Sequence, residues 1–144
     1  KTDNPGRFQV LPGRPLVVLD VAHNPHAAAA LAATLRELPG KGRVLAVFAM
    51  LNDKDIGGVV AAVKHAVDEW LIADIAAPRG ADCSALRAAL TAAGVTARVD
   101  EHGSVAAAYA RACERATDDD KIVVFGSFYT VAGVMAARAA RTTR

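Results

Sequence analysis

The sequence has little of what marks a secreted, membrane-spanning or metal-binding protein. It contains only two cysteines, Cys83 and Cys113, which lack a CxxC partner and a histidine at metal-ligand spacing. We expect both to be small buried residues of a protein in the reducing cytoplasm. The longest apolar runs, such as 44–51, are far too short to cross a bilayer. The first residues, KTDNPGRFQ, have no apolar core and therefore do not form a signal peptide.

The chain also has no large excess of charge and lacks several common motifs. Its 17 basic and 15 acidic residues leave a formal net charge of +2, which predicts no surface for nucleic acid or membrane. The sequence contains no GxxxxGK[ST] phosphate-binding loop. GKGR at 40–43 lacks this pattern, and it precedes a strand-like run rather than following one. NDKD at 52–55 lacks the Gly and Glu of a calcium loop. No nucleophile, base and acid are grouped as they are in hydrolases.

What is present is the composition of an ordinary globular domain. Of the 144 residues, 53% are hydrophobic and 22% are charged, and this length fits a single domain, 1–144, with a core of its own. The chain starts with Lys1 rather than methionine, and its first residues resemble a linker. We therefore expect it to be a piece of a longer protein.

Short apolar runs alternate with helical patterns along the chain. The runs are rich in β-branched residues, as buried strands are, and the segments between them carry apolar residues three and four positions apart. The expected strands lie at 15–22, 43–50, 69–76 and 121–126, with a weak edge strand at 96–99. Five strands that alternate with five helices predict a Rossmann-like three-layer α/β domain. Its mainly parallel sheet has helices on both faces.

Residues that favour helix starts follow the expected strands. Asn24 is the expected N-cap of the first helix, and Pro25 is its first residue. An apolar stripe at 56–67 predicts the second helix. The expected caps of the later helices are Asp55, Asp82 or Ser84, Ser104 and Ser127.

Polar residues gather where the expected strands end. Clusters follow four of them, at 20–26, 52–55, 79–82 and 126–127. In an open α/β sheet, ligands bind at the carboxyl ends of the strands, beside helix N-termini whose free N–H groups favour anions. The clusters therefore predict a binding site at this edge of the sheet.

Two residues of the first cluster are more than turn residues. A carboxylate at the end of a buried strand must find donors, which for Asp20 are either N–H groups of its own turn or hydroxyl groups of a ligand. His23, three residues later, either faces the same crevice or is a structural residue of the loop. Asn24 and His26 have simpler interpretations, as a helix cap and as an exposed residue of the first helical turn.

Five segments together resemble one protein family. They are GRFQVL (6–11), LDVAHNPHAA (19–28), MLNDKDI (50–56), DEW…APRGA (68–81) and FGSFYTVAGVM (125–135), in this order and at natural distances. They resemble the C-terminal, glutamate ligase domain of bacterial bifunctional dihydrofolate synthase/folylpolyglutamate synthases, in the Mur ligase family. The resemblance covers nearly the whole chain, and AHNP and GSFYTV are typical of the folate branch.

This resemblance implies an ATP-dependent ligase that adds L-glutamate to dihydropteroate and to (poly)glutamylated folates through an acyl phosphate. It also implies that Mg²⁺ and the P-loop belong to an N-terminal ATPase domain of the same chain, absent from 1–144. The fragment alone is therefore expected to be inactive. The resemblance further implies a cytoplasmic monomer, and neither a nucleic acid nor a membrane is expected as a partner.

The same resemblance implies roles for four residues. Arg7 would reach the nucleotide phosphates, and Asp20 would accept hydrogen bonds from the ribose hydroxyls. His23, as the catalytic residue, and Ser127 would lie near the acyl phosphate and the incoming glutamate. No metal ligand is expected within the chain. The alternative is a stand-alone α/β module that binds a nucleotide or another small molecule without catalysis, which explains the alternation but not the five segments together.

Overall fold

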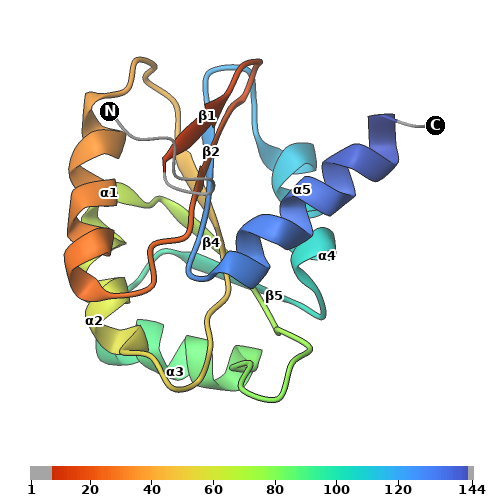
Figure 1. Ribbon diagram of the computed structural model, residues 1–144. Coiled ribbons are helices and arrows are strands. Elements are labelled where there is room, and N and C mark those ends of the chain that lie inside the picture. The colour runs from red at the N-terminus through yellow and green to blue at the C-terminus, as the bar shows by residue number, and fades with distance from the viewer. Residues whose placement is uncertain (1–7, 143–144) are drawn as a thin grey trace.

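Strands and helices alternate through most of the computed structural model, which describes residues 8–142 (Figure 1). No helix within this range is long and apolar enough to cross a membrane. The strands are β1 Gln9–Leu11, β2 Leu16–Asp20, β3 Val44–Phe48, β4 Glu69–Ala73, β5 Arg98–His102 and β6 Lys121–Phe125. The helices are α1 Pro25–Glu37, α2 Ile56–Val63, α3 Cys83–Ala92, α4 Val105–Arg115 and α5 Phe128–Thr142, with a 3₁₀ turn, η1 Lys64–Ala66, after α2.

The last strand in the sequence lies in the middle of the sheet. The strand order is β1-β2-β6-β3-β4-β5; β1 pairs antiparallel with β2, and all other neighbours are parallel. Asp20 of β2 and Phe48 of β3 are both register partners of Phe125 of β6. These three strands therefore end level with one another, and the loops that follow them meet at one edge.

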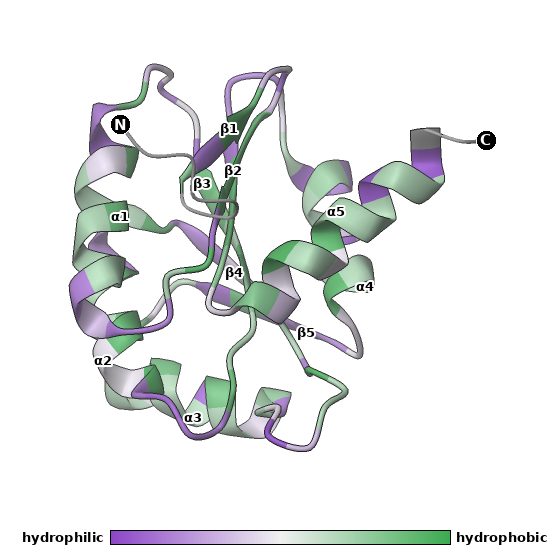
Figure 2. Cartoon of the chain, in the orientation of Figure 1, coloured by the Kyte–Doolittle hydropathy of each residue, from purple (hydrophilic) through white to green (hydrophobic). Residues whose placement is uncertain are grey.

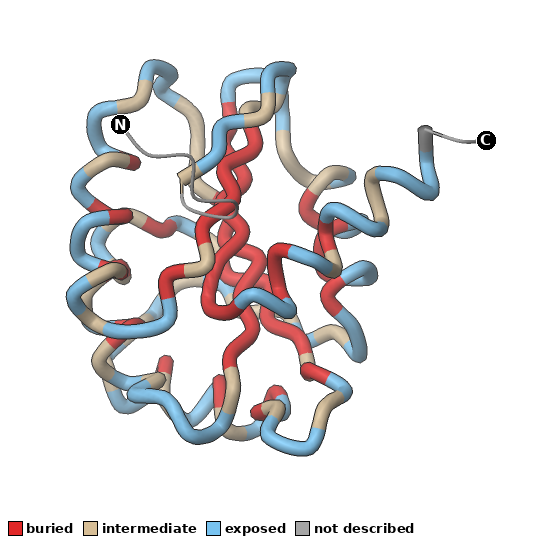
Figure 3. Tube along the Cα trace, in the orientation of Figure 1, coloured by how far each residue is buried: buried red, intermediate tan, exposed pale blue. Residues whose placement is uncertain are grey.

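Helices cover both faces of the sheet, as the sequence predicts. α1, α2 and α3 pack on one face and α4 and α5 on the other (Figures 1 and 2). Because successive strand residues point to opposite faces, Val123 of β6 packs in the first layer and Val124 in the second. Burial is concentrated along the central strands (Figure 3). A strand covered on both sides has to be apolar throughout, which explains the continuous runs in the sequence.

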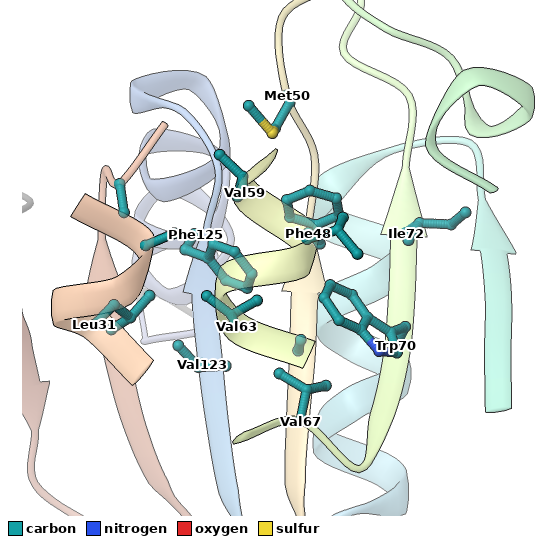
Figure 4. Close-up of a cluster of buried hydrophobic side chains, with 14 of the residues drawn as sticks. Leu31, Phe48, Met50, Val59, Val63, Val67, Trp70, Ile72, Val123 and Phe125 are labelled. Atoms are coloured by element: carbon teal, nitrogen blue, oxygen red, sulfur yellow. The ribbon is translucent and has the colours of Figure 1, made fainter. Parts of the chain in front are cut away.

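Three aromatic rings form the centre of the layer beneath α1, α2 and α3 (Figure 4). The ring of Phe48 lies with its centroid 5.3 Å from that of Trp70 and 4.9 Å from that of Phe125. Edge-on and tilted pairs at such distances contribute beyond the burial of their area. Since Phe48 and Phe125 are the last residues of β3 and β6, this cluster fixes the two strand ends that lead into polar loops.

The helix caps confirm the sequence prediction. Asn24 Oδ1 accepts a hydrogen bond from the N–H of Ala27 (2.8 Å), and Pro25 is the first residue of α1. Of the two candidates for α3, the cap is Asp82, whose Oδ1 accepts from the N–H of Ala85 (2.9 Å). Two further caps follow the same pattern, Asp55 to Gly58 and Ser104 to Ala107.

Three local expectations were wrong. The sequence predicts five strands and misses β1, because three residues are too few to show a period. The edge strand is indeed at the edge, but it occupies 98–102 rather than 96–99, since its polar RVDEH lacks an apolar signal. The second helix ends at Val63 rather than Val67, where the backbone is already extended.

A charged network lies at the opposite edge, at the amino ends of the strands. Asp120 is 4% exposed and accepts hydrogen bonds from the backbone N–H groups of Arg43 and Thr117 (2.7 Å each) and from Arg43 Nη2 (2.9 Å). Arg43 and Arg115 both pair with Glu69. Burial opposes ionisation of Asp120, but these donors outweigh it and lower its pKa to about 2. This network holds strand ends together and lies away from the predicted site.

Candidate functional site

Three loops meet at the carboxyl edge of the sheet and enclose a pocket of about 220 Å³. They follow β2, β6 and β3, the three strands that end level, and they lie where α1 and α5 begin (Figure 1). The pocket is lined by His23 from the first loop, 126–129 from the second, and Leu51 and Lys54 from the third. The structure thus brings together two predicted site residues, His23 and Ser127.

Asp20 lies at the base of this edge, as the last residue of β2. It is 7% exposed, and its Oδ1 accepts a hydrogen bond from the backbone N–H of Ala22 (2.9 Å). Of the two kinds of donor that the sequence allows, the N–H of its own turn is therefore one. This bond fixes the carboxylate at the start of the loop that carries His23, while the contact with a ribose stays a prediction.

His23 is exposed, and one hydrogen bond to the backbone of its own loop orients its ring. Its Nδ1 lies 3.0 Å from the carbonyl oxygen of Val21. A carbonyl can only accept, so we assign the proton to Nδ1, and Nε2 of the neutral ring keeps its lone pair. The ring is thus oriented by its own loop, with Nε2 as the nitrogen that can bind a ligand or accept a proton.

Ser127 fixes the start of α5. It is 4% exposed, and its Oγ accepts from the N–H of Thr130 (3.1 Å) and lies 2.8 Å from Thr130 Oγ1. Thr130 Oγ1 donates its own hydrogen to the carbonyl of Ala49 (2.7 Å), so the hydrogen between the two hydroxyls belongs to Ser127. Ser127 is therefore a helix cap at the wall of the pocket, and its predicted substrate contact stays a prediction.

The first turn of α5 forms that wall and suits an anion. The helix start 126–129 lines the pocket, and Ser127 binds the N–H of Thr130 through its hydroxyl and the N–H of Val131 through its carbonyl (3.3 Å). The two N–H groups before them have no acceptor within the helix, as at any helix start, and favour a negative group such as a phosphate. Lys54 adds an exposed ammonium group to the same pocket.

Gly126 permits this close approach of β6 to the end of β3. Its φ of +119° is a conformation that L side chains rarely adopt, and a Cβ there would lie 2.2 Å from the carbonyl oxygen of Ala49. This is the carbonyl that accepts the hydroxyl of Thr130. A glycine between strand and helix is therefore required for the shape of the pocket.

A neighbouring loop braces the pocket without lining it. The polar clusters at 52–55 and 79–82 are joined by an ion pair between Asp53 and Arg79 (2.5 Å) and by a bond from the N–H of Asn52 to the carbonyl of Arg79 (2.5 Å). The cluster after β4 thus lies at the predicted edge, but its role among the described residues is to hold the loop after β3.

Sequence reasoning gave no individual role to three residues of the pocket, Lys54, Phe128 and Tyr129. Lys54 belongs to the polar cluster at 52–55, which the sequence places at this edge, but its side chain was not singled out. Phe128 and Tyr129 are 67% and 51% exposed. The signal was two large aromatic residues directly after a helix cap, but apolar periodicity alone does not separate exposed residues from core residues.

The described residues leave the role of Arg7 untested and contain no cluster of metal ligands. Arg7 falls outside the described residues, so its contact with nucleotide phosphates stays a prediction. Within residues 8–142, no group of three or more His, Cys, Asp or Glu side chains could hold a metal ion.

Sequence comparison relates this chain to one family. The family model "Mur ligase, glutamate ligase domain" matches residues 6–128. The dihydrofolate synthase/folylpolyglutamate synthase of Escherichia coli (strain K12) is 47% identical over 131 residues, which are 91% of this chain and 30% of that protein. A probable bifunctional folylpolyglutamate synthase/dihydropteroate synthase of Halobacterium salinarum is 39% identical over 89% of this chain and 15% of that protein. The chain thus spans about a third or less of the length of these relatives.

Solved structures agree with this relation. E. coli FolC in complex with DHPP and ADP has a TM-score of 0.89 and 45% identity, with 96% of this chain and 32% of that chain covered. A bifunctional folylpolyglutamate synthase/dihydrofolate synthase with Mn, AMPPNP and L-glutamate bound has a TM-score of 0.86 and 45% identity, with 95% and 32% covered. The Mycobacterium tuberculosis folylpolyglutamate synthase complexed with ADP has a TM-score of 0.80 and 30% identity, with 98% and 32% covered.

Proposed function

Because this chain belongs to the Mur ligase family, as a glutamate ligase domain, we propose that it is one part of an ATP-dependent ligase. This enzyme adds L-glutamate to dihydropteroate and to (poly)glutamylated folates. The identity to bifunctional dihydrofolate synthase/folylpolyglutamate synthases supports the substrates. Since the chain matches 30% of the E. coli relative, we propose that a P-loop ATPase domain, N-terminal in the same protein, supplies the rest of the site.

The reaction has two chemical steps. The carboxylate of the substrate attacks the γ-phosphorus of ATP, ADP leaves, and an acyl phosphate forms. The amine of L-glutamate then attacks the acyl carbon, inorganic phosphate leaves, and the amine gives up a proton as the amide forms. The protein must therefore neutralise the migrating phosphoryl group and hold the amine within reach of the acyl carbon.

The observation that carries this proposal is the pocket shared by His23, Lys54 and the first turn of α5. The ammonium group of Lys54 and the N–H groups of the helix start suit the negative charge of the phosphoryl group. Nε2 of His23, with its lone pair, suits the proton that the amine releases. Ser127, as the helix cap, positions these N–H groups and borders the incoming glutamate.

The remaining contacts belong to the nucleotide side. We propose that Asp20 binds the ribose hydroxyls and that Arg7 binds the phosphates when the two domains close on each other. Mg²⁺, held by the ATPase domain, supplies charge neutralisation at the ATP phosphates. The two cysteines are free thiols, which suits the cytoplasm, where we propose that the enzyme works as a monomer.

The proposal is tested by ADP release from the full-length protein that contains this chain. Dihydropteroate and L-glutamate are added separately and together, and we expect sustained ADP release only with both. ADP release that does not depend on glutamate, or no ADP release at all, would overturn the proposal of a ligase. The alternative would then be a module that binds a nucleotide or another small molecule without catalysis. The isolated chain serves as the control and should release no ADP above background.

A further inference from the structure

A second pocket, of about 320 Å³, lies at the end of the molecule opposite the site. It is lined by residues of the turn between β1 and β2, which is at the top of Figure 1, and by residues of α4 and of the last turns of α5. Its walls include Pro12, Pro15 and Val17, which are apolar. The proposed ligase reaction gives this pocket no role.

The charge of this pocket is of one sign. Arg14, Arg138 and Arg141 line it, and none of its described lining residues is acidic. Arg14 makes one long ion pair with Asp119 (3.6 Å), and both side chains are more than two-thirds exposed, so this pair neutralises little of its charge. Within residues 8–142, Arg138 and Arg141 form no ion pair with an acidic side chain.

One of these arginines is positioned in advance. Arg138 Nη1 donates a hydrogen bond to the hydroxyl oxygen of Tyr109 (2.8 Å), and the Tyr109 side chain is packed between α4 and the sheet with 3% exposure. The remaining N–H groups of the guanidinium keep their capacity for a ligand. Cys113, one turn further along α4, also lines the pocket and is half-buried rather than buried as the sequence predicts.

From this geometry we propose that the pocket binds a small organic anion, a carboxylate or phosphate group on an apolar body. The anionic group lies between Arg138 and Arg141, which can both donate to its oxygens. The apolar body lies against Pro15, Val17 and the ring of Tyr109. Binding here is independent of ATP and of the pocket that contains His23.

Titration followed by backbone amide NMR shifts tests this proposal. Phenyl phosphate and benzoate distinguish a phosphate from a carboxylate ligand, and benzyl alcohol is the uncharged control. We expect saturable shifts at Val17 and Cys113 with one or both anions, none with benzyl alcohol, and none at His23. No saturable shift with either anion, or equal shifts with benzyl alcohol, would overturn the proposal.

Arginine variants test which charges hold the anion. Arg141→Gln changes an exposed side chain and should weaken binding roughly threefold, the effect of removing one charge about 6 Å from the anion at the dielectric of water. Arg138→Lys keeps the charge but loses the fork and should weaken binding as well. Arg36→Gln removes the same charge from α1, on the other face of the sheet, and should leave binding unchanged. Equal effects of Arg141→Gln and Arg36→Gln on anion binding would mean that the anion is attracted by the net charge of the protein and not by this pocket, which would overturn the proposal.

Discussion

Replacing Asp120 by Asn should remove a pH-dependent part of the domain's stability. The carboxylate accepts three N–H bonds from Arg43 and Thr117, and its pKa is about 2 in the folded protein instead of 3.8. Because the folded pKa is the lower one, the ionised form stabilises the fold above about pH 4, and this contribution is lost as the pH falls toward 2. A change from 3.8 to about 2 corresponds to about 2.5 kcal/mol, of which about 1 kcal/mol is lost by pH 3.

The assay is urea unfolding at pH 6, 4 and 3, followed through the fluorescence of Trp70. This is the single tryptophan, and it is 1% exposed in the core, so unfolding changes its surroundings completely. The difference in unfolding free energy between the wild type and Asp120→Asn cancels the other carboxylates. It should be largest at pH 6 and smaller by about 1 kcal/mol at pH 3.

The adjacent Asp119→Asn is the matched control. Its side chain is 77% exposed and its one described ion pair, with Arg14, is 3.6 Å long, so its difference from the wild type should stay within about 0.5 kcal/mol at every pH. A difference for Asp120→Asn that is constant from pH 6 to pH 3 would refute the reasoning. So would the same pH dependence in both variants, because burial and the three N–H bonds distinguish Asp120 from its neighbour.

Three further changes test the pocket and the proposed nucleotide contact beside it. Gly126→Ala should lower the unfolding free energy by more than about 2 kcal/mol in urea unfolding, since its Cβ meets the carbonyl of Ala49, whereas Gly57→Ala, in open space on α2, should be neutral or stabilising. His23→Ala should lower the turnover of the full-length ligase in the ADP assay and leave the unfolding free energy within about 0.5 kcal/mol, because the side chain is exposed; an unfolded variant would make His23 a structural residue. Asp20→Ala should raise the KM for ATP severalfold in the same assay, and an unchanged KM would exclude the ribose contact.

The sequence was sufficient for the parts of the fold that local patterns determine. Asn24 with Pro25 marks a helix start by its own chemistry, and the run at 121–126 is apolar because both faces of β6 are covered. β1 escaped prediction because its three residues form a strand only by pairing with β2. The polar strand β5 was shifted in the prediction because its partner β4, rather than its own composition, determines its register.

The site was predicted in part for the same reason. Each polar cluster can be read from the sequence, but which clusters face one another depends on the strand order. β6 lies between β2 and β3, so the loop of His23 meets the loops of Ser127 and Lys54. The cluster at 79–82 follows β4 and remains one strand further away. The exposure of Phe128 and Tyr129 depends on how α5 packs and therefore required the structure.

The central position of β6 also affects how this domain folds during its synthesis on the ribosome. Synthesis delivers β2 and β3 before β6, the strand at 121–125 that lies between them in the sheet. Until it emerges, β2 and β3 each leave one edge of backbone N–H and C=O groups unpaired, and unpaired strand edges favour aggregation of nascent chains. Contacts between residues as far apart as Leu16 and Lys121 are also slow to form, because a long loop has to close first. A chain truncated before residue 125 therefore lacks the strand that pairs with both β2 and β3. It also lacks residues 126–129, which form one wall of the pocket.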